Sequence, residues 1–266
     1  MIEYFSQTAI NQFFRCGEQF RRRYIEGEII PPGIAAKIGT GLHKGAEVNY
    51  WAKLITGTDE PMDIVTDAAR DGYVKSLQDG VFFPPDEISG AKKKLAEGAD
   101  IAVSLARTFR TELAPTVQPK LIEQALYLEV PDLPLPFRGV IDLLTDRHEW
   151  RDLKSSEKKW PEGRVDSEIQ ATLYWKLVKE STGQAPNRLF YDIFTKSGFK
   201  YQCVETERAE ADFDVLVDKA KVMWKSITAG VFHPAQAGNW LCSQKWCGYF
   251  WSCKFIPAHR KILPKG

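Results

Sequence analysis

Two neighbouring stretches decide the fold: Phe137-Arg138-Gly139-Val140-Ile141-Asp142-Leu143-Leu144 and Glu149-Trp150-Arg151-Asp152-Leu153. Their apolar content, and the turn residues Asp146-Arg147-His148 between them, predict two paired β-strands. Asp142 is a carboxylate in an otherwise apolar strand, and it needs a reason because an unpaired buried charge is costly. The alternative is an aspartate at a strand end that faces solvent.

The second stretch ends in Asp152-Leu153-Lys154. Residues two apart on a strand point to the same face, so Asp152 and Lys154 lie side by side. Alone this pattern is common, and it fits a surface ion pair equally well. The Asp152-Leu153-Lys154 pattern becomes informative beside Asp142 of the neighbouring strand. Two carboxylates near a lysine can bind a divalent cation and position a water for phosphodiester attack.

A helix is expected next, over about residues 166–182, and it ends at Gly183. Gln170 and Tyr174 are four residues apart, so they share one face of this helix. They could align Lys154 or a phosphate oxygen. The alternative is an ordinary amphipathic helix in which Tyr174 and Trp175 are packing residues.

Two residues outside these elements are candidates for the same site. His43 lies in Gly39-Thr40-Gly41-Leu42-His43, and a neutral imidazole is a good ligand for Mn²⁺. A lone histidine is more often structural. Glu123 precedes Asp142 on an earlier strand, where an exposed strand carboxylate is the favoured account.

The rest of the chain changes from helical to strand periodicity. Helices are expected over 6–24, from about 39 to 55, and near 63–78, 86–113 and 209–229; further strands are expected over 120–130, 188–195 and 200–206. A strand trio, a helix and a strand pair predict an α/β fold with a mixed sheet flanked by helices. We expect a single domain over 1–266, with a helical region (1–115) that carries His43, a catalytic core (116–208), and a C-terminal helix and cysteine cap (209–266).

The composition is that of an ordinary globular protein, with 44% hydrophobic and 27% charged residues among 266. No apolar run reaches transmembrane length, and the N-terminus lacks the pattern of a signal peptide, so we expect a cytoplasmic protein without membrane contact. The net charge of +1 argues against a basic nucleic-acid coat, although it allows a local positive channel.

The five cysteines are placed unevenly. Three of them, Cys242, Cys247 and Cys253, crowd the C-terminus, whereas Cys16 is near the N-terminus and Cys203 stands alone. In a cytosolic protein this placement favours metal or cluster ligation over disulfides.

The ordered set His43, Asp142, Asp152-x-Lys154 and Gln170-xxx-Tyr174 resembles the RecB-type branch of the PD-(D/E)XK nuclease superfamily. The resemblance extends over nearly the whole chain, through Ser6-x-Thr8, Phe13, Cys16, Phe20 and Tyr24 and through the tail Trp240-Leu241-Cys242, Trp246-Cys247-Gly248-Tyr249 and Cys253. Within this branch, the chain resembles most the stand-alone exonucleases of phages and the related CRISPR-adaptation nucleases.

This resemblance implies a restriction-endonuclease-like fold and a metal-dependent DNA nuclease. Asp142 and Asp152 would hold Mg²⁺ or Mn²⁺, His43 would be an accessory ligand and Lys154 the catalytic lysine. Gln170 and Tyr174 would support the site and contact DNA. The implied activity is an exonuclease acting on single strands or DNA ends in phage-type recombination or repair, with a recombination protein as a conceivable partner.

The resemblance also implies that Cys16, Cys242, Cys247 and Cys253 hold a [4Fe–4S] cluster. Four residues separate Cys242 from Cys247, whereas two are common in the family. A Zn²⁺ site, or cysteines kept without a cofactor, are therefore alternatives. Cys203 is expected to be a small buried residue.

Two other functions compete with a nuclease. A non-catalytic DNA-binding or scaffold subunit would have no need for Asp142, Asp152 and Lys154 together. A small-molecule metallohydrolase usually carries clusters of histidines, which are missing here. If the protein binds unpaired bases, Tyr174, Trp160 and Trp175 are aromatic candidates for stacking on them.

Overall fold

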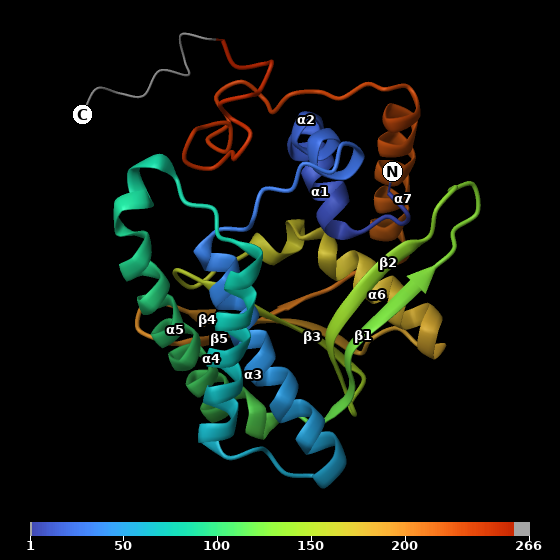
Figure 1. Ribbon diagram of the computed structural model, residues 1–266. Helices are drawn as coiled ribbons and strands as arrows, with labels where there is room; N and C mark the ends of the chain where they lie inside the picture. Colours follow the sequence, from blue (N-terminus) through green and yellow to red (C-terminus); the bar gives the residue numbers. More distant parts are fainter. Residues whose placement is uncertain (1, 258–266) are drawn as a thin grey trace.

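The centre of the molecule is a mixed five-stranded sheet, seen in a computed structural model that describes residues 2–257 (Figure 1). The strands follow the chain order: β1 (Pro119–Leu128), β2 (Phe137–Thr145), β3 (Glu149–Ser156), β4 (Arg188–Thr195) and β5 (Tyr201–Thr206). Neighbouring strands are antiparallel except β3 and β4, which are parallel. The predicted mixed α/β sheet is confirmed.

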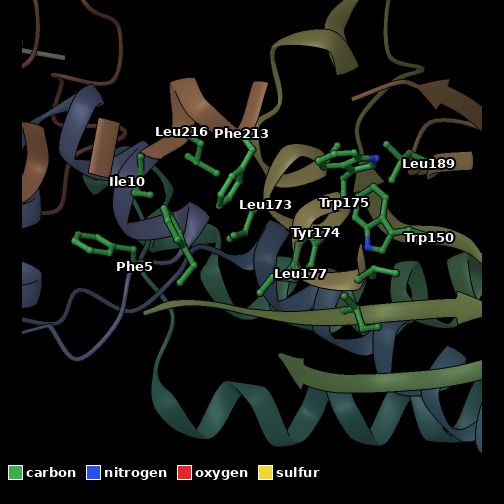
Figure 2. Close-up of a cluster of buried hydrophobic side chains, with 14 of the residues drawn as sticks. Phe5, Ile10, Trp150, Leu173, Tyr174, Trp175, Leu177, Leu189, Phe213 and Leu216 are labelled. Atoms are coloured by element: carbon green, nitrogen blue, oxygen red, sulfur yellow. The ribbon is translucent and has the colours of Figure 1, made fainter. Parts of the chain in front are cut away.

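Helices cover both faces of the sheet. The parallel step from β3 to β4 needs a crossover, which η6 (Arg164–Ser167) and α6 (Ile169–Thr182) supply. The core on this side also includes residues of α1 (Gln7–Arg15) and α7 (Glu210–Thr228). Figure 2 shows this core, with Tyr174 and Leu177 of α6 beside the sheet and Phe213 and Leu216 of α7 farther along.

The opposite face carries the helical region of the chain. It consists of α3 (Ile34–Thr56), α4 (Met62–Ser76), η2 (Leu77–Asp79), η3 (Pro85–Gly90), α5 (Ala91–Thr108), η4 (Phe109–Leu113) and η5 (Ala114–Thr116). A second apolar core joins these helices to Leu143, Leu153 and Phe194 of the sheet. The sheet therefore separates two cores, and the helix that carries His43 packs against β1, which carries Glu123, and β3, which carries Asp152.

The first predicted helix, over 6–24, is interrupted. Ser6 caps α1 by accepting a hydrogen bond from the backbone N–H of Ala9 at 3.2 Å, and α1 ends at Cys16, whose backbone is extended. The chain continues as α2 (Gly17–Phe20) and the π-type turn η1 (Arg21–Ile25). A Cβ at Gly17 would lie only 2.9 Å from the backbone nitrogen of His233, so this break lets the C-terminal segment pack directly on the N-terminal one.

The C-terminal segment after α7 forms a cap beside α2 (Figure 1). Cys247, Tyr249 and Phe250 form a small apolar cluster of their own, against Ile30 and Ile256. Within residues 2–257, no helix has both the length and the apolar character needed to cross a bilayer.

Candidate active site

Asp142 of β2 and His43 of α3 meet where the helical region covers the sheet. One Asp142 oxygen, Oδ2, accepts a hydrogen bond from the Leu153 backbone N–H at 2.9 Å and lies 3.4 Å from Nδ1 of His43. The other ring nitrogen of His43, Nε2, lies 2.9 Å from the Leu153 carbonyl oxygen. If Nε2 donates to that carbonyl, a neutral His43 has an unprotonated Nδ1 that faces the carboxylates. This tautomer can ligate a metal through Nδ1.

Glu123 of β1 completes this group. Its Oε1 is 3.9 Å from His43 Nδ1, and one ligand atom each of His43, Glu123 and Asp142 lie within 4.8 Å of one another. The backbone of Glu123 has a φ of +47°, which is strained for a residue other than glycine. Sequence analysis named Glu123 as a candidate but favoured an exposed strand carboxylate, and the residue is indeed exposed. The strand register, which joins Ile122 to Leu143 and Gln124 to Ile141, brings it opposite Asp142.

Asp152 and Lys154 of β3 lie beside this group and are supported by α6. Asp152 is 2% exposed, and its Oδ1 accepts a hydrogen bond from Gln170 at 2.6 Å. Lys154 Nζ is 2.5 Å from the other oxygen, Oδ2, but that oxygen has no hydrogen bond of acceptable geometry. A buried carboxylate oxygen that accepts no hydrogen bond needs a positive partner, and a divalent cation could serve together with Lys154.

Tyr174 stands behind Gln170. Its ring is 6% exposed, stacks on Trp150 at 5.4 Å, and packs so closely on Gly139 that a Cβ there would lie 2.6 Å from it. Because Tyr174 is buried, the structure does not support the implied contact between this residue and DNA. Its position instead supports helix α6. Trp160 and Trp175 are each 8% exposed, so all three aromatic candidates for base stacking are core residues.

The charges of the site are mutually dependent. Burial opposes a charged His43, but Asp142 and Glu123 outweigh burial and raise the pKa of His43 to about 9. Burial raises the pKa of Asp152 to about 6, although Lys154 opposes this, and burial likewise raises the pKa of Asp142. Three carboxylates thus crowd against one lysine and one histidine, an arrangement that a bound divalent cation would relieve.

The donor set fits Mg²⁺ or Mn²⁺. Carboxylate oxygens suit both ions, and an imidazole nitrogen is acceptable to Mn²⁺. His43, Glu123 and Lys154 line an open cavity of about 430 Å³, which leaves room for a phosphate group beside them.

The four clustered cysteines lie elsewhere, between the cap and the N-terminal helices. Cys16, Cys242, Cys247 and Cys253 line one cavity, and Gln19 donates a hydrogen bond to Cys247 Sγ at 3.1 Å. Burial and the neighbouring thiols Cys16 and Cys253 raise the pKa of Cys247. Cys203 is remote from them on β5, 3.5 Å from Arg151, and is exposed, so the expectation that it is buried is wrong. The edge position of β5 explains this exposure.

Comparisons with known proteins concern the whole chain and its fold. The family model described as the PD-(D/E)XK nuclease superfamily matches residues 4–254. A crystal structure described as a "putative exonuclease" from Eubacterium rectale has a TM-score of 0.57 and 14% identity, covering 96% of this chain and 90% of its own. At that identity the likeness supports the fold alone. The structure of SSO0001 covers 99% of this chain and 89% of its own at 12% identity, with a TM-score of 0.42. No curated protein matches.

Proposed function

The chain belongs to the PD-(D/E)XK nuclease superfamily, and we propose from this premise that it is a metal-dependent exonuclease acting on single-stranded DNA or DNA ends. The observation that carries the proposal is the meeting of Asp142 of β2 and Asp152 and Lys154 of β3 beside His43 of α3. A scaffold protein would gain nothing from one buried and one half-buried carboxylate held this close to a lysine, since they cost stability when no cation is bound.

In the proposed mechanism Asp142, Asp152 and His43 Nδ1 would hold Mg²⁺ or Mn²⁺, with Glu123 close by. When bound, the cation would polarise the phosphate and lower the pKa of a water. Lys154 stabilises the attacking hydroxide and the charge that develops on the phosphate oxygens. Gln170 fixes the orientation of Asp152 through its 2.6 Å hydrogen bond, so the site is ordered before substrate arrives.

We further propose that Cys16, Cys242, Cys247 and Cys253 hold a [4Fe–4S] cluster. The support for a shared site is that these four cysteines line one cavity between the cap and the N-terminal region. A Zn²⁺ ion held by the same four thiols is the alternative. The longer gap after Cys242 is taken up by a turn, in which the Cys247 N–H donates to the Ser243 carbonyl at 2.8 Å.

The nuclease proposal is tested with metal-stripped protein and end-labelled DNA. Linear single strands, linear duplexes and circular single strands are incubated with Mn²⁺, with Mg²⁺ or with chelator. We expect degradation of linear DNA only, with either metal, and none by Asp142→Ala. Cleavage of circles would refute the exonuclease assignment, and metal-independent or absent cleavage would favour the non-catalytic scaffold.

The cluster is tested on anaerobically purified protein. We expect a brown sample with about four irons per chain. A colourless protein that contains stoichiometric zinc would show that the same site holds zinc and not iron.

On the resemblance to phage enzymes, we also propose a role in DNA recombination or repair, with a recombination protein as partner. Co-purification with such a protein from infected cells would test this role.

A further inference from the structure

A second cavity adjoins the proposed active site. It has a volume of about 610 Å³ and lies between the start of α3, the segment before η3, and the C-terminal cap. Ala36 of α3 lines both this cavity and the active-site cavity. Seven residues of helix, about 10 Å, separate Ala36 from His43. The two cavities therefore meet at Ala36, and together they are called the groove.

The walls of the second cavity are aromatic and apolar. Phe82 and Phe83 are partly buried, and Trp246 reaches it from the cap with 55% of its surface exposed. Accessible aromatic side chains beside a reaction site indicate that a ligand with flat apolar faces binds there. Unpaired nucleic-acid bases have such faces, and stacking on aromatic side chains is how single strands are commonly held.

The charges around the cavity fit a nucleic-acid strand that contacts the wall mainly through its bases and less through its phosphates. Lys94, Lys196 and Lys245 line it, but so do three glutamates, and Lys94 is paired with Glu87 at 2.7 Å. A wall of balanced charge is unsuited to duplex DNA, which hides its base faces and is held mainly through its phosphates. A cavity of this size also admits a single strand more readily than a duplex.

Lys196 is the exception among these lysines. Within the described residues it has no ion pair, and burial lowers its pKa, so its charge would gain from a phosphate. The Lys196 backbone N–H donates to the Ser156 carbonyl at 2.8 Å, which sets Lys196 beside the end of β3. Ser156 is two residues beyond Lys154, about 7 Å along the strand. Lys196 thus lies between the catalytic lysine and the aromatic wall.

We propose that this groove is the binding path for an unpaired DNA strand, which runs from the scissile phosphate past Lys196 to Phe83 and Trp246. This inference rests on the proposed nuclease function, and it specifies the substrate as a single strand. A duplex end would have to be opened before it could enter.

Binding of a fluorescein-labelled oligothymidylate tests the groove. Anisotropy is measured with Ca²⁺ replacing Mn²⁺ to prevent turnover, and hydrolysis of bis(p-nitrophenyl) phosphate with Mn²⁺ reports the chemistry without a strand. In Phe83→Ala/Trp246→Ala we expect oligothymidylate affinity to fall about tenfold or more, with the small diester hydrolysed as in wild type. Trp246→Phe should keep most of the affinity. The matched control is Tyr127→Ala, which removes an aromatic side chain that is 60% exposed on β1.

Lys196→Ala gives an independent readout. Loss of one phosphate contact should lower the slope of log affinity against log salt by about 0.7 for a single strand. Unchanged oligothymidylate binding in both the aromatic and the lysine variants would refute the groove. So would a blunt duplex that competes as well as the single strand. If wild type hydrolyses neither the small diester nor DNA, the nuclease proposal itself has failed, whatever the binding shows.

Discussion

The proposed active site and the cysteine cap are held in place by different means. The active site takes its side chains from β2, β3, α3 and α6, and its aspartates are fixed by hydrogen bonds to Leu153 and Gln170. The cap has no helix or strand in its described part, residues 231–257. It contacts the N-terminal region through an apolar cluster that includes Ile30 and through single bonds such as Arg22 to Ser252 at 2.6 Å. Regular structure therefore orders the first region without a metal, whereas we expect the second to depend on the group that its thiols are proposed to bind.

The comparison predicts that changes in the active site remove activity but leave the fold. Asp152→Ala and Lys154→Ala should each lower the rate of DNA cleavage by on the order of 10²-fold or more, because they remove a metal ligand or the charge that stabilises the transition state. Single-turnover assays with saturating Mn²⁺ measure the rate, and thermal unfolding monitors the fold. A near-normal rate in Asp152→Ala would contradict the proposed role of this residue.

Changes in the cap should do the reverse. Cys16→Ser or Cys247→Ser should bleach the expected brown colour and lower the unfolding temperature, because a bound cluster ties the two ends of the chain together. Each kcal/mol lost corresponds to about 2–4 °C for a chain of this size. Hydrolysis of the small diester, which does not need the cap, should stay near the wild-type rate in the protein that remains folded.

Cys203→Ser is the matched control for the cap. This thiol is exposed on β5 and remote from the cap, so neither colour nor unfolding temperature should change. Equal destabilisation by Cys203→Ser and Cys16→Ser would show that the cap has no special dependence on its thiols, and the contrast between the two regions would be lost.

The same contrast explains what the sequence could predict. The strands around Asp142 and Asp152 were predictable because alternation and turn residues are local signals. The break at Cys16 was not predicted, and it lies next to a contact that local signals do not reveal: Gly17 packs on the backbone of His233, more than two hundred residues away. Trp160 and Trp175 were proposed to stack on bases but are buried, since composition does not tell which aromatic residues form the core. The roles of the site residues stay predictions.

His43 should tune metal binding more than chemistry. Its pKa is raised to about 9, so at neutral pH the metal-free site holds a proton that a cation must displace. The apparent affinity for Mn²⁺ should therefore rise with pH up to about 9 in wild type. His43→Ala should raise the half-saturating Mn²⁺ concentration about tenfold and flatten this pH dependence. Metal titrations of cleavage at several pH values measure both, and identical curves would place His43 outside the site.

The smallest expected effect concerns stability without metal, and it follows from Asp152. The pKa of this carboxyl is 3.8 in an unperturbed chain and about 6 in the folded protein, mainly because of burial. The folded state therefore holds the proton more tightly than the unfolded state. Below about pH 4 both states are protonated and nothing is lost. As the pH rises from about 4 to about 6, the folded state loses stability, and the loss is complete above that range.

Asp152→Asn removes this penalty and keeps the hydrogen-bonding shape. In the presence of chelator above about pH 6, we expect the variant to be more stable than wild type by on the order of 1–3 kcal/mol. The difference should vanish near pH 4, and Mn²⁺ should reverse it by stabilising only wild type. Thermal unfolding across this pH range measures the effect. A destabilised Asp152→Asn in chelator would mean that Lys154 already satisfies the carboxylate, and that the site is balanced without a cation, unlike the cap.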